Sequence, residues 1–219
     1  MKISIITVSL NAGKTIKRTF ESVINQSFSN IEYIIIDGGS TDGTLKVVED
    51  YADYISYFVS EKDKGVFDAM NKGIRISTGD LVGIINADDW LEPNACEIAA
   101  KEYSDNAEDL VICGKMNVWE NERLIKTLSP STEGLRSGMT ILHPASFVTR
   151  ELYEEYGLYN TDYYIASDYD LYLKMYLGGV RFRCINEIFA NFALGGISTQ
   201  NKVLGKKEEN IISLKYGSR

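Results

Sequence analysis

Two adjacent carboxylates, Asp88 and Asp89, directly follow a short apolar run at residues 81–85. The run predicts a buried strand, so both acids would stand at its carboxyl end. Neighbouring carboxylates repel each other there and lose hydration. A hard divalent cation, Mg²⁺ or Mn²⁺, shared with a substrate phosphate would stabilise such a pair. The alternative is a solvated turn that caps a helix expected from about residues 92–93.

Asp37 ends a second apolar run, at residues 32–37, and is followed by Gly38 and Gly39. An Asp before two glycines is often a turn former whose side chain accepts local N–H groups. Its carboxylate can instead accept the N3–H of a uracil or thymine base, which a turn does not require. Taken alone, the residue favours the turn.

Asp168 and Asp170 lie in a helix expected over residues 168–177. Residues two apart point about 200° apart around a helix, so the two carboxylates cannot share one site. Asp168 falls on the apolar face, where loss of hydration raises the pKa of a carboxyl group and makes it a stronger base toward a hydroxyl. Asp170 falls toward Lys174, which predicts a structural ion pair. Asp168 can also be the N-cap of the helix, and the two roles are compatible.

Candidates for contact with a second substrate are weaker. The single histidine, His143, lies beside apolar residues, where a His is more often a hydrogen-bonded core residue than a substrate contact. Tyr159, Tyr163 and Tyr164 lie shortly before the helix that carries the base, and their rings could stack on the C–H face of a sugar. Residues 194–199 contain two glycines, typical of a hinge that closes over a ligand and equally of a simple turn.

The elements that must position these groups alternate along the first half of the chain. Apolar runs predict strands at residues 3–8, 32–37, 55–59 and 81–85, and helical patterns lie between them at about residues 16–28, 44–52 and 67–74. This order predicts βαβ units and a parallel sheet with helices on both faces. Ligands bind beyond the carboxyl ends of such strands. Polar residues fall at four of these ends: Thr7 and Ser9, Asp37 to Gly39, residues 63–65, and Asp88 with Asp89.

The second half is less regular and predicts an α+β arrangement. Expected elements are a helix at 92–103, a strand at 110–119, a hairpin turn at 120–123, a loop at 129–138, helices at 150–156 and 168–177, and two short strands within 180–193. The tail from residue 200 is polar with a weak helical pattern. We expect a single domain with a nucleotide half at about 1–115, an acceptor half at about 116–200 and a tail at 201–219.

Composition excludes several classes of protein. The 219 residues are 44% hydrophobic and 25% charged, which is ordinary for a globular domain, and the net charge is −8. A negative chain is a poor binder of nucleic acid, which requires an excess of Lys and Arg. Three scattered cysteines predict buried thiols in a reducing compartment. No apolar run approaches the ~20 residues that span a bilayer. We therefore expect a cytoplasmic protein, at most associated with the inner surface of a membrane.

Five motifs occur in an order that resembles a known family. They lie at residues 4–11, 34–44, 63–73, 86–89 and 166–171. Together they resemble a family 2 glycosyltransferase, most closely the bacterial enzymes of colanic-acid and capsular polysaccharide assembly. The resemblance implies the GT-A fold, an α/β architecture. Its Rossmann-like nucleotide-binding half has a mixed, mainly parallel sheet flanked by helices, and an α+β acceptor half follows.

The resemblance also implies residue roles. Thr7, Ser9 and Asp37 match the positions that hold the base and ribose of a nucleoside-diphosphate sugar, most simply a UDP-sugar. The motif that contains Asn86 and Asp88 belongs to the same donor site. The loop lining that site contains Asp63 and Lys64. The Asp-X-Asp-type metal motif is matched by Asp88 and Asp89, with Asp89 as the usual ligand, and the catalytic base by Asp168. With this context the base contact is favoured for Asp37, and His143 and Tyr164 are candidates for the acceptor side.

The chemistry of glycosyl transfer agrees with these residue types. Negative charge builds on the leaving diphosphate, and a divalent metal that bridges both phosphates stabilises it. Lys64 could add a mobile positive charge, although a lone loop lysine is usually just solvated. We therefore expect a metal-dependent, inverting enzyme whose acceptor is a saccharide or a lipid-linked saccharide. One alternative is a sugar-phosphate nucleotidyltransferase, which the weak glycine loop at residues 11–14 supports poorly. Another is a non-catalytic sugar-nucleotide-binding subunit of a polysaccharide assembly complex.

Overall fold

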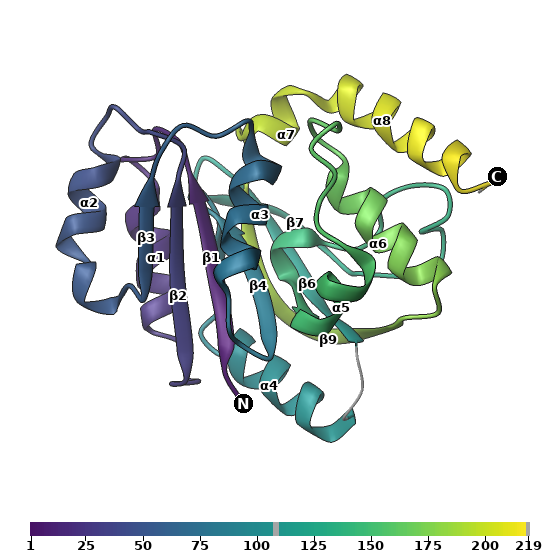
Figure 1. Cartoon of the computed structure of the whole chain (residues 1–219), viewed down its shortest axis with the longest axis horizontal. Helices are drawn as coiled ribbons and strands as arrows, with labels where there is room; N and C mark the ends of the chain where they lie inside the picture. Colours follow the sequence, from purple (N-terminus) through teal and green to yellow (C-terminus); the bar gives the residue numbers. More distant parts are fainter. Residues whose placement is uncertain (107–109, 218–219) are drawn as a thin grey trace.

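A single mixed β-sheet forms the centre of the molecule (Figure 1). The computed structural model describes residues 1–106 and 110–217. The strand order is β3-β2-β1-β4-β8-β6-β9-β5, and β7 pairs with β6. The strands are β1 Ile3–Ser9, β2 Ile31–Asp37, β3 Tyr57–Ser60, β4 Leu81–Asn86, β5 Trp90–Leu91, β6 Leu110–Glu120, β7 Arg123–Leu128, β8 Ser146–Thr149 and β9 Arg181–Ala193.

The first four strands of this order form the parallel part that the sequence predicts. In β1 all seven residues are buried, because helices cover both faces of a parallel sheet. The register places the strand ends side by side: Ser9 lies opposite Asp37, Asp37 opposite Ser60, and Val8 opposite Asn86. One edge of the sheet therefore collects the polar residues that follow the apolar runs.

The second half adds antiparallel pairs. Strand β8, which the sequence did not reveal, pairs antiparallel with both β4 and β6 and joins the two halves of the sheet. The expectation of two short strands after residue 180 is wrong, because β9 runs without a break from Arg181 to Ala193 beside β6. The expected hairpin is confirmed at β6 and β7, where Asn121 and Glu122 take positive φ values in the turn.

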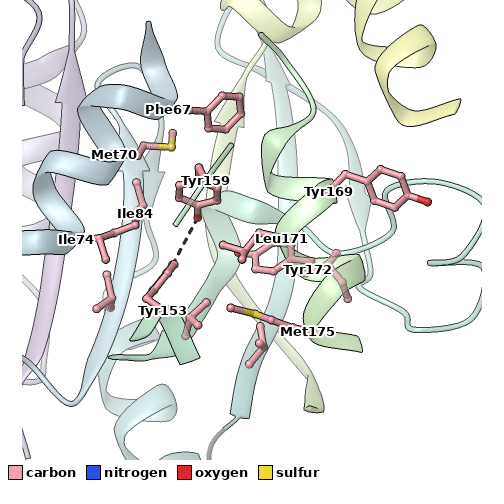
Figure 2. Close-up of a cluster of buried hydrophobic side chains, with 14 of the residues drawn as sticks. Phe67, Met70, Ile74, Ile84, Tyr153, Tyr159, Tyr169, Leu171, Tyr172 and Met175 are labelled. Carbon is pink, nitrogen blue, oxygen red and sulfur yellow. Dashed lines mark hydrogen bonds between the residues drawn. The ribbon is translucent and has the colours of Figure 1, made fainter. Parts of the chain in front are cut away.

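Helices cover the two faces of the sheet in separate layers. They are α1 Ile16–Ile24, α2 Thr44–Asp50, α3 Val66–Ile76, α4 Ala95–Asn106, α5 Arg150–Tyr156, α6 Ser167–Leu177, α7 Ile197–Gln200 and α8 Lys202–Lys215, with short 3₁₀ turns at Ala52–Tyr54 and His143–Ala145. One core contains side chains of α1, α2 and α4, and the other contains side chains of α3, α5 and α6. In the second core Tyr159 lies between Phe67 of α3 and Tyr153 of α5 (Figure 2).

Several helix limits differ from the sequence expectation. Phe28 lies beyond α1, and α4 begins at Ala95 because Trp90 and Leu91 pair with β9 first. The tail forms a full helix, α8, which lies beside α6 (Figure 1). No helix in residues 1–106 and 110–217 combines the length and the apolar character that crossing a membrane requires.

Candidate active site

Asp37 is fully buried, and donors surround both of its carboxylate oxygens. Oδ1 accepts hydrogen bonds from the hydroxyls of Ser9 (2.9 Å) and Ser40 (2.5 Å). Oδ2 accepts the N–H groups of Gly39 (3.0 Å) and Ser40 (2.8 Å) and the hydroxyl of Ser60 (2.7 Å). Burial acts to raise the pKa of Asp37, but these hydrogen bonds outweigh it and hold the pKa below its usual value. The geometry therefore favours the turn-forming role over contact with a base.

Asp63 brings a freer carboxylate to the same turn. Its Oδ1 accepts the N–H of Gly65 at 2.9 Å, whereas Oδ2 receives no hydrogen bond from the described residues. A Cβ atom on Gly38 would lie 2.5 Å from that Oδ2 and 3.5 Å from Cδ1 of Leu10. A side chain at position 38 would displace this oxygen. The Leu10 side chain beside it is 59% exposed. An open carboxylate oxygen and an exposed apolar side chain thus stand together at the sheet edge.

The hydroxyl groups of Thr7 and Ser9 bind other side chains of the protein. Thr7 has no exposed surface, and its hydroxyl lies 3.0 Å from that of Tyr33 inside the core. Ser9 is nearly buried and donates to Asp37. In this structure neither hydroxyl is open to a nucleotide, which differs from the roles that the motif implies.

Asp88 and Asp89 differ sharply in environment although they are adjacent. Asp89 has no exposed surface; its Oδ1 accepts the N–H of Ala193 at 2.9 Å and its Oδ2 accepts Nδ2 of Asn86 at 3.2 Å. Asp88 is partly exposed, and its carboxylate accepts no hydrogen bond from another described residue. A Cβ atom on Gly196 would lie 2.8 Å from its Oδ2, so residues just before α7 border this carboxylate. Asp89 ties β4 to the end of β9, and Asp88 is the open member of the pair.

The electrostatics of this pair suit a divalent cation. Burial raises the pKa of both carboxyl groups, and the charge of Asp88 raises that of Asp89 further. The nearest opposing charge is Arg18 of α1, whose guanidinium stacks 3.5 Å from the Trp90 ring and also pairs with Glu122. Among the described residues no group of three or more His, Cys, Asp or Glu side chains is placed to hold a metal. One or two carboxylates completed by phosphate oxygens and water form a typical Mg²⁺ ligand set, so the residues present fit such a metal.

Asp168 stands in the first turn of α6, as the sequence predicts, but the N-cap is Ala166. It is partly buried, and burial raises the pKa of its carboxyl group to about 7. The N–H of Tyr169, which donates to Oδ1 at 2.8 Å, lowers the pKa, and the charges of Glu209 and Glu208 raise it. A carboxylate with a pKa near neutrality can accept a proton at physiological pH.

Asp170 is buried and paired, as expected, but its partner differs from the prediction. It accepts a hydrogen bond from Nζ of Lys215 of α8 at 2.9 Å, while Lys174 donates to the backbone oxygen of Tyr156 instead. The prediction of an i to i+4 pair with Lys174 is wrong, because packing of α8 on α6 brings a cation from 45 residues away. Asp170 joins two helices.

The loop between α5 and α6 connects the sheet edge to Asp168. Asn71 of α3 binds the backbone of Tyr159 twice, by donating to its oxygen (2.8 Å) and accepting its N–H (2.9 Å). Further along, residues 161–164 face residues 64–68 across a pocket of about 130 Å³. Lys64 has an exposed side chain without an ion pair in the described chain, and Tyr164 is 48% exposed. Both therefore lie where a ligand can reach them.

His143 is a core residue. It is buried, its Nε2 lies 3.1 Å from the hydroxyl of Tyr159, and its ring packs near Tyr172. Burial lowers its pKa to about 4, so the ring is neutral near pH 7. The structure favours the core role over an acceptor contact.

Two contributors to the site escaped the sequence reasoning: Arg18 and Glu208. Each comes from an element far from the motif it touches, so spacing along the chain gives no signal for it. The approach of Gly196 to Asp88 does show that residues 194–199 border the site, as the glycine pair suggested.

Comparison with known proteins identifies the family. A family model described as glycosyl transferase family 2 matches residues 4–175. The chain belongs to glycosyl transferase family 2. The chondroitin synthase of Escherichia coli is 34% identical over 215 residues, which cover 95% of this chain and 31% of that protein. The chain thus spans less than a third of that relative's length.

Solved structures share the fold. Staphylococcus aureus TarS residues 1–349 in complex with UDP-GlcNAc matches with a TM-score of 0.73 and 21% identity, over 90% of this chain and 59% of that one. A Pyrobaculum calidifontis mannosyltransferase in complex with GDP-Man and Mn²⁺ matches with a TM-score of 0.72 and 19% identity, over 99% of this chain and 64% of that one. These likenesses confirm the expected GT-A fold, and the family match disfavours the nucleotidyltransferase alternative.

Proposed function

We propose that this chain is the glycosyltransferase domain of a cell-surface polysaccharide enzyme. It would transfer a sugar, with inversion and with the help of a divalent metal, from a nucleoside-diphosphate sugar to a saccharide or lipid-linked saccharide. The observation that carries the proposal is the presence of two carboxylates in different environments. Asp88 is open at the sheet edge, and Asp168 has a raised pKa at the start of α6. Family membership and the polysaccharide synthase among the relatives support the class of reaction.

The donor base is uracil in this proposal, and Asp63 accepts its N3–H. Asp63 rather than Asp37 has an oxygen free for this hydrogen bond, and Leu10 offers an apolar surface beside it for the ring. The UDP-GlcNAc bound by TarS supports the choice of base by analogy alone. Asn86 and the exposed ammonium of Lys64 would complete the donor side, the latter near the phosphates.

A divalent metal, Mn²⁺ or Mg²⁺, would be held by Asp88, with Asp89 behind it, and when bound would stabilise negative charge on the diphosphate. Asp89 fixes the turn through Asn86 and Ala193, so it orients Asp88 and adds negative charge. The Mn²⁺ in the mannosyltransferase complex supports the type of ion.

Asp168 would act as the base that takes the proton from the acceptor hydroxyl as that oxygen attacks the anomeric carbon. Its raised pKa suits this task, and the N–H of Tyr169 holds one carboxylate oxygen while leaving the other free to receive the proton. Tyr164, which lines the 130 Å³ pocket together with Lys64, would contact the acceptor.

The outer face of α8 would place the domain at the inner surface of the membrane. Val203, Leu204, Ile211 and Leu214 are exposed there, and Val203 is 73% exposed. The neighbouring Lys202 and Lys207 form no ion pair within the described residues, although the chain as a whole carries a net charge of −8. Exposed apolar side chains beside unpaired lysines suit a surface of anionic lipid.

Calorimetric titration of UDP with and without Mn²⁺ tests the donor site and the metal together. We expect UDP to bind much more weakly after chelation, and Asp88→Ala to bind equally weakly in either condition. Asp105→Ala, a change at an exposed acid at the end of α4, is the matched control and should behave as the native chain. Equal affinity of the native chain with and without metal would exclude the metal.

A further inference from the structure

Glu208 of α8 is a buried glutamate whose carboxylate binds backbone groups of a neighbouring loop. It is buried, and its carboxylate accepts three consecutive backbone N–H groups of the loop that leads into α6. Oε1 accepts the N–H of Tyr164 at 2.9 Å, and Oε2 accepts those of Ile165 at 2.8 Å and Ala166 at 2.9 Å. One carboxylate therefore satisfies three successive backbone donors.

These three donors end directly before the first turn of α6, two residues from Asp168. A carboxylate at this place also faces the positive end of the helix dipole, which favours negative charge. On the opposite side of the loop, Asn71 of α3 holds the backbone of Tyr159 by two hydrogen bonds. The loop is thus held between α3 and α8.

We propose that Glu208 is the positioning residue for the catalytic base: it fixes the backbone at residues 164–166 and thereby the place of Asp168. The inference rests on the proposed role of Asp168. It gives the C-terminal helix a part in catalysis, although α8 lies beyond the residues that the family model matches.

The charged groups around Asp168 determine how its pKa should change when Glu208 is replaced. Glu208 and Glu209 of α8 both act on it, and both raise its pKa. The phenols of Tyr159 and Tyr172 lie close enough for Asp168 to influence their own pKa values. Lys206 of α8 pairs with Glu209 and offsets part of that charge. Loss of the Glu208 charge, and the greater hydration of a loosened loop, both lower the pKa of Asp168.

Glu208→Gln tests the proposal while nearly preserving volume. One carboxylate oxygen becomes an NH₂ group, which cannot accept, so at least one backbone N–H loses its partner. We expect faster hydrogen exchange at the amides of residues 164–166. We also expect the acid limb of the kcat profile to move to lower pH, and kcat on the plateau to fall by about 10- to 100-fold while donor affinity holds.

Lys215→Met is the matched control. It removes the ion pair that Lys215, the last residue of α8, forms with Asp170. It should lower the melting temperature while leaving the exchange at residues 164–166 and the pH profile unchanged. A Glu208→Gln variant that loses only thermal stability, with a native pH profile and plateau, would reduce Glu208 to a structural residue and overturn the proposal.

Failure of the proposed function looks different. Native turnover in Asp168→Asn, measured in the same assay, would remove Asp168 as the base whatever Glu208 does. Turnover lost in Asp168→Asn but native in Glu208→Gln, with unchanged exchange, would leave the function intact and overturn only the inference about Glu208.

Discussion

Acidic residues of this chain fall into two groups according to whether a carboxylate oxygen is left free. Asp37, Asp89 and Glu208 are buried, and both oxygens of each accept hydrogen bonds from the protein. Asp63 and Asp88 each keep an oxygen without a donor from the described residues. An oxygen that receives no donor from the protein is the most accessible to a ligand, and that difference determines which variants report on binding.

Asp63→Asn should alter the choice of nucleotide base. The amide can still accept the N–H of Gly65 through its oxygen, while its NH₂ group replaces the free oxygen. Uracil N3 is a donor and cytosine N3 is an acceptor, so the variant should lose its preference for UDP over CDP. Calorimetry with both nucleotides in the presence of Mn²⁺ measures this. An unchanged preference would mean that another group contacts the base.

Asp37→Ala should act on stability instead. It leaves up to five protein donors without their acceptor, and each buried group left unpaired costs about 1–3 kcal/mol. We expect a clearly lower free energy of unfolding in urea. A melting temperature near the native value together with weak UDP binding would restore the base contact that the motif implies.

Asp168→Asn should lower turnover by about 10²–10⁴-fold with donor affinity unchanged, because the amide cannot accept the acceptor's proton. In the native chain, activity should rise with pH through about 7, since only the deprotonated carboxylate is a base. Asp170→Asn, two residues away, is the control and should keep its rate, since Asp170 faces Lys215. A loss of turnover confined to Asp170→Asn would mean that Asp170, and not Asp168, is the base.

At the scale of elements, the sequence predicts the parallel half of the sheet well and the C-terminal half poorly. Strands β1, β2 and β4 are continuous apolar runs, because they are buried on both faces. The first eight residues of strand β9 alternate irregularly between exposed and half-buried positions, only residues 189–191 are buried, and polar residues near its middle resemble a turn. Its pairing with β6, about 70 residues away, decides its length, and no local pattern contains that information.

Helix α8 shows why part of the site could not be predicted. Its buried positions include Gly205, Glu208 and Ser213, while Val203 and Ile211 are exposed. Most large apolar side chains of α8 therefore lie on its outer face. Its inner face combines the buried Ile212 with polar side chains that bind the loop before α6 and Tyr169 of α6. The same cause hid the pairing of Asp170 with Lys215. The motifs did predict that Asp88, Asp89 and Asp168 lie at the ends of elements, where the structure places them; their roles stay predictions.

The link between α3 and the loop before α6 gives a prediction for an element. Asn71→Ala should leave the N–H and the C=O of Tyr159 unpaired in the core, at a cost of about 1–3 kcal/mol for each group. The free energy of unfolding in urea should fall accordingly, and kcat should fall with it because the loop loses one of its two anchors. Asn25→Ala, at the exposed end of α1, removes a single surface hydrogen bond and should change little. Native stability of Asn71→Ala would show that the loop is held by Glu208 alone.

At the scale of the whole molecule, the distribution of charge and apolar surface predicts an orientation on a membrane. A net charge of −8 repels anionic lipid, so binding requires a local patch. The outer face of α8 supplies one, with four exposed apolar side chains beside Lys202 and Lys207. Each lysine near an anionic surface contributes about 1 kcal/mol, and buried apolar area adds to it.

We expect the native chain to sediment with vesicles that contain phosphatidylglycerol, more weakly in high salt, and not with vesicles of phosphatidylcholine alone. Ile211→Glu with Leu214→Glu should abolish sedimentation, because two charges would replace the apolar contact. Leu124→Glu makes the same kind of change at an exposed leucine of β7 and should leave binding intact. Light scattering on the same proteins tests the alternative that this face binds a second copy of the chain. The result would contradict lipid binding if the native chain forms dimers, the α8 variant does not, and neither protein sediments with either kind of vesicle. In that case α8 binds a second copy of the chain and not lipid.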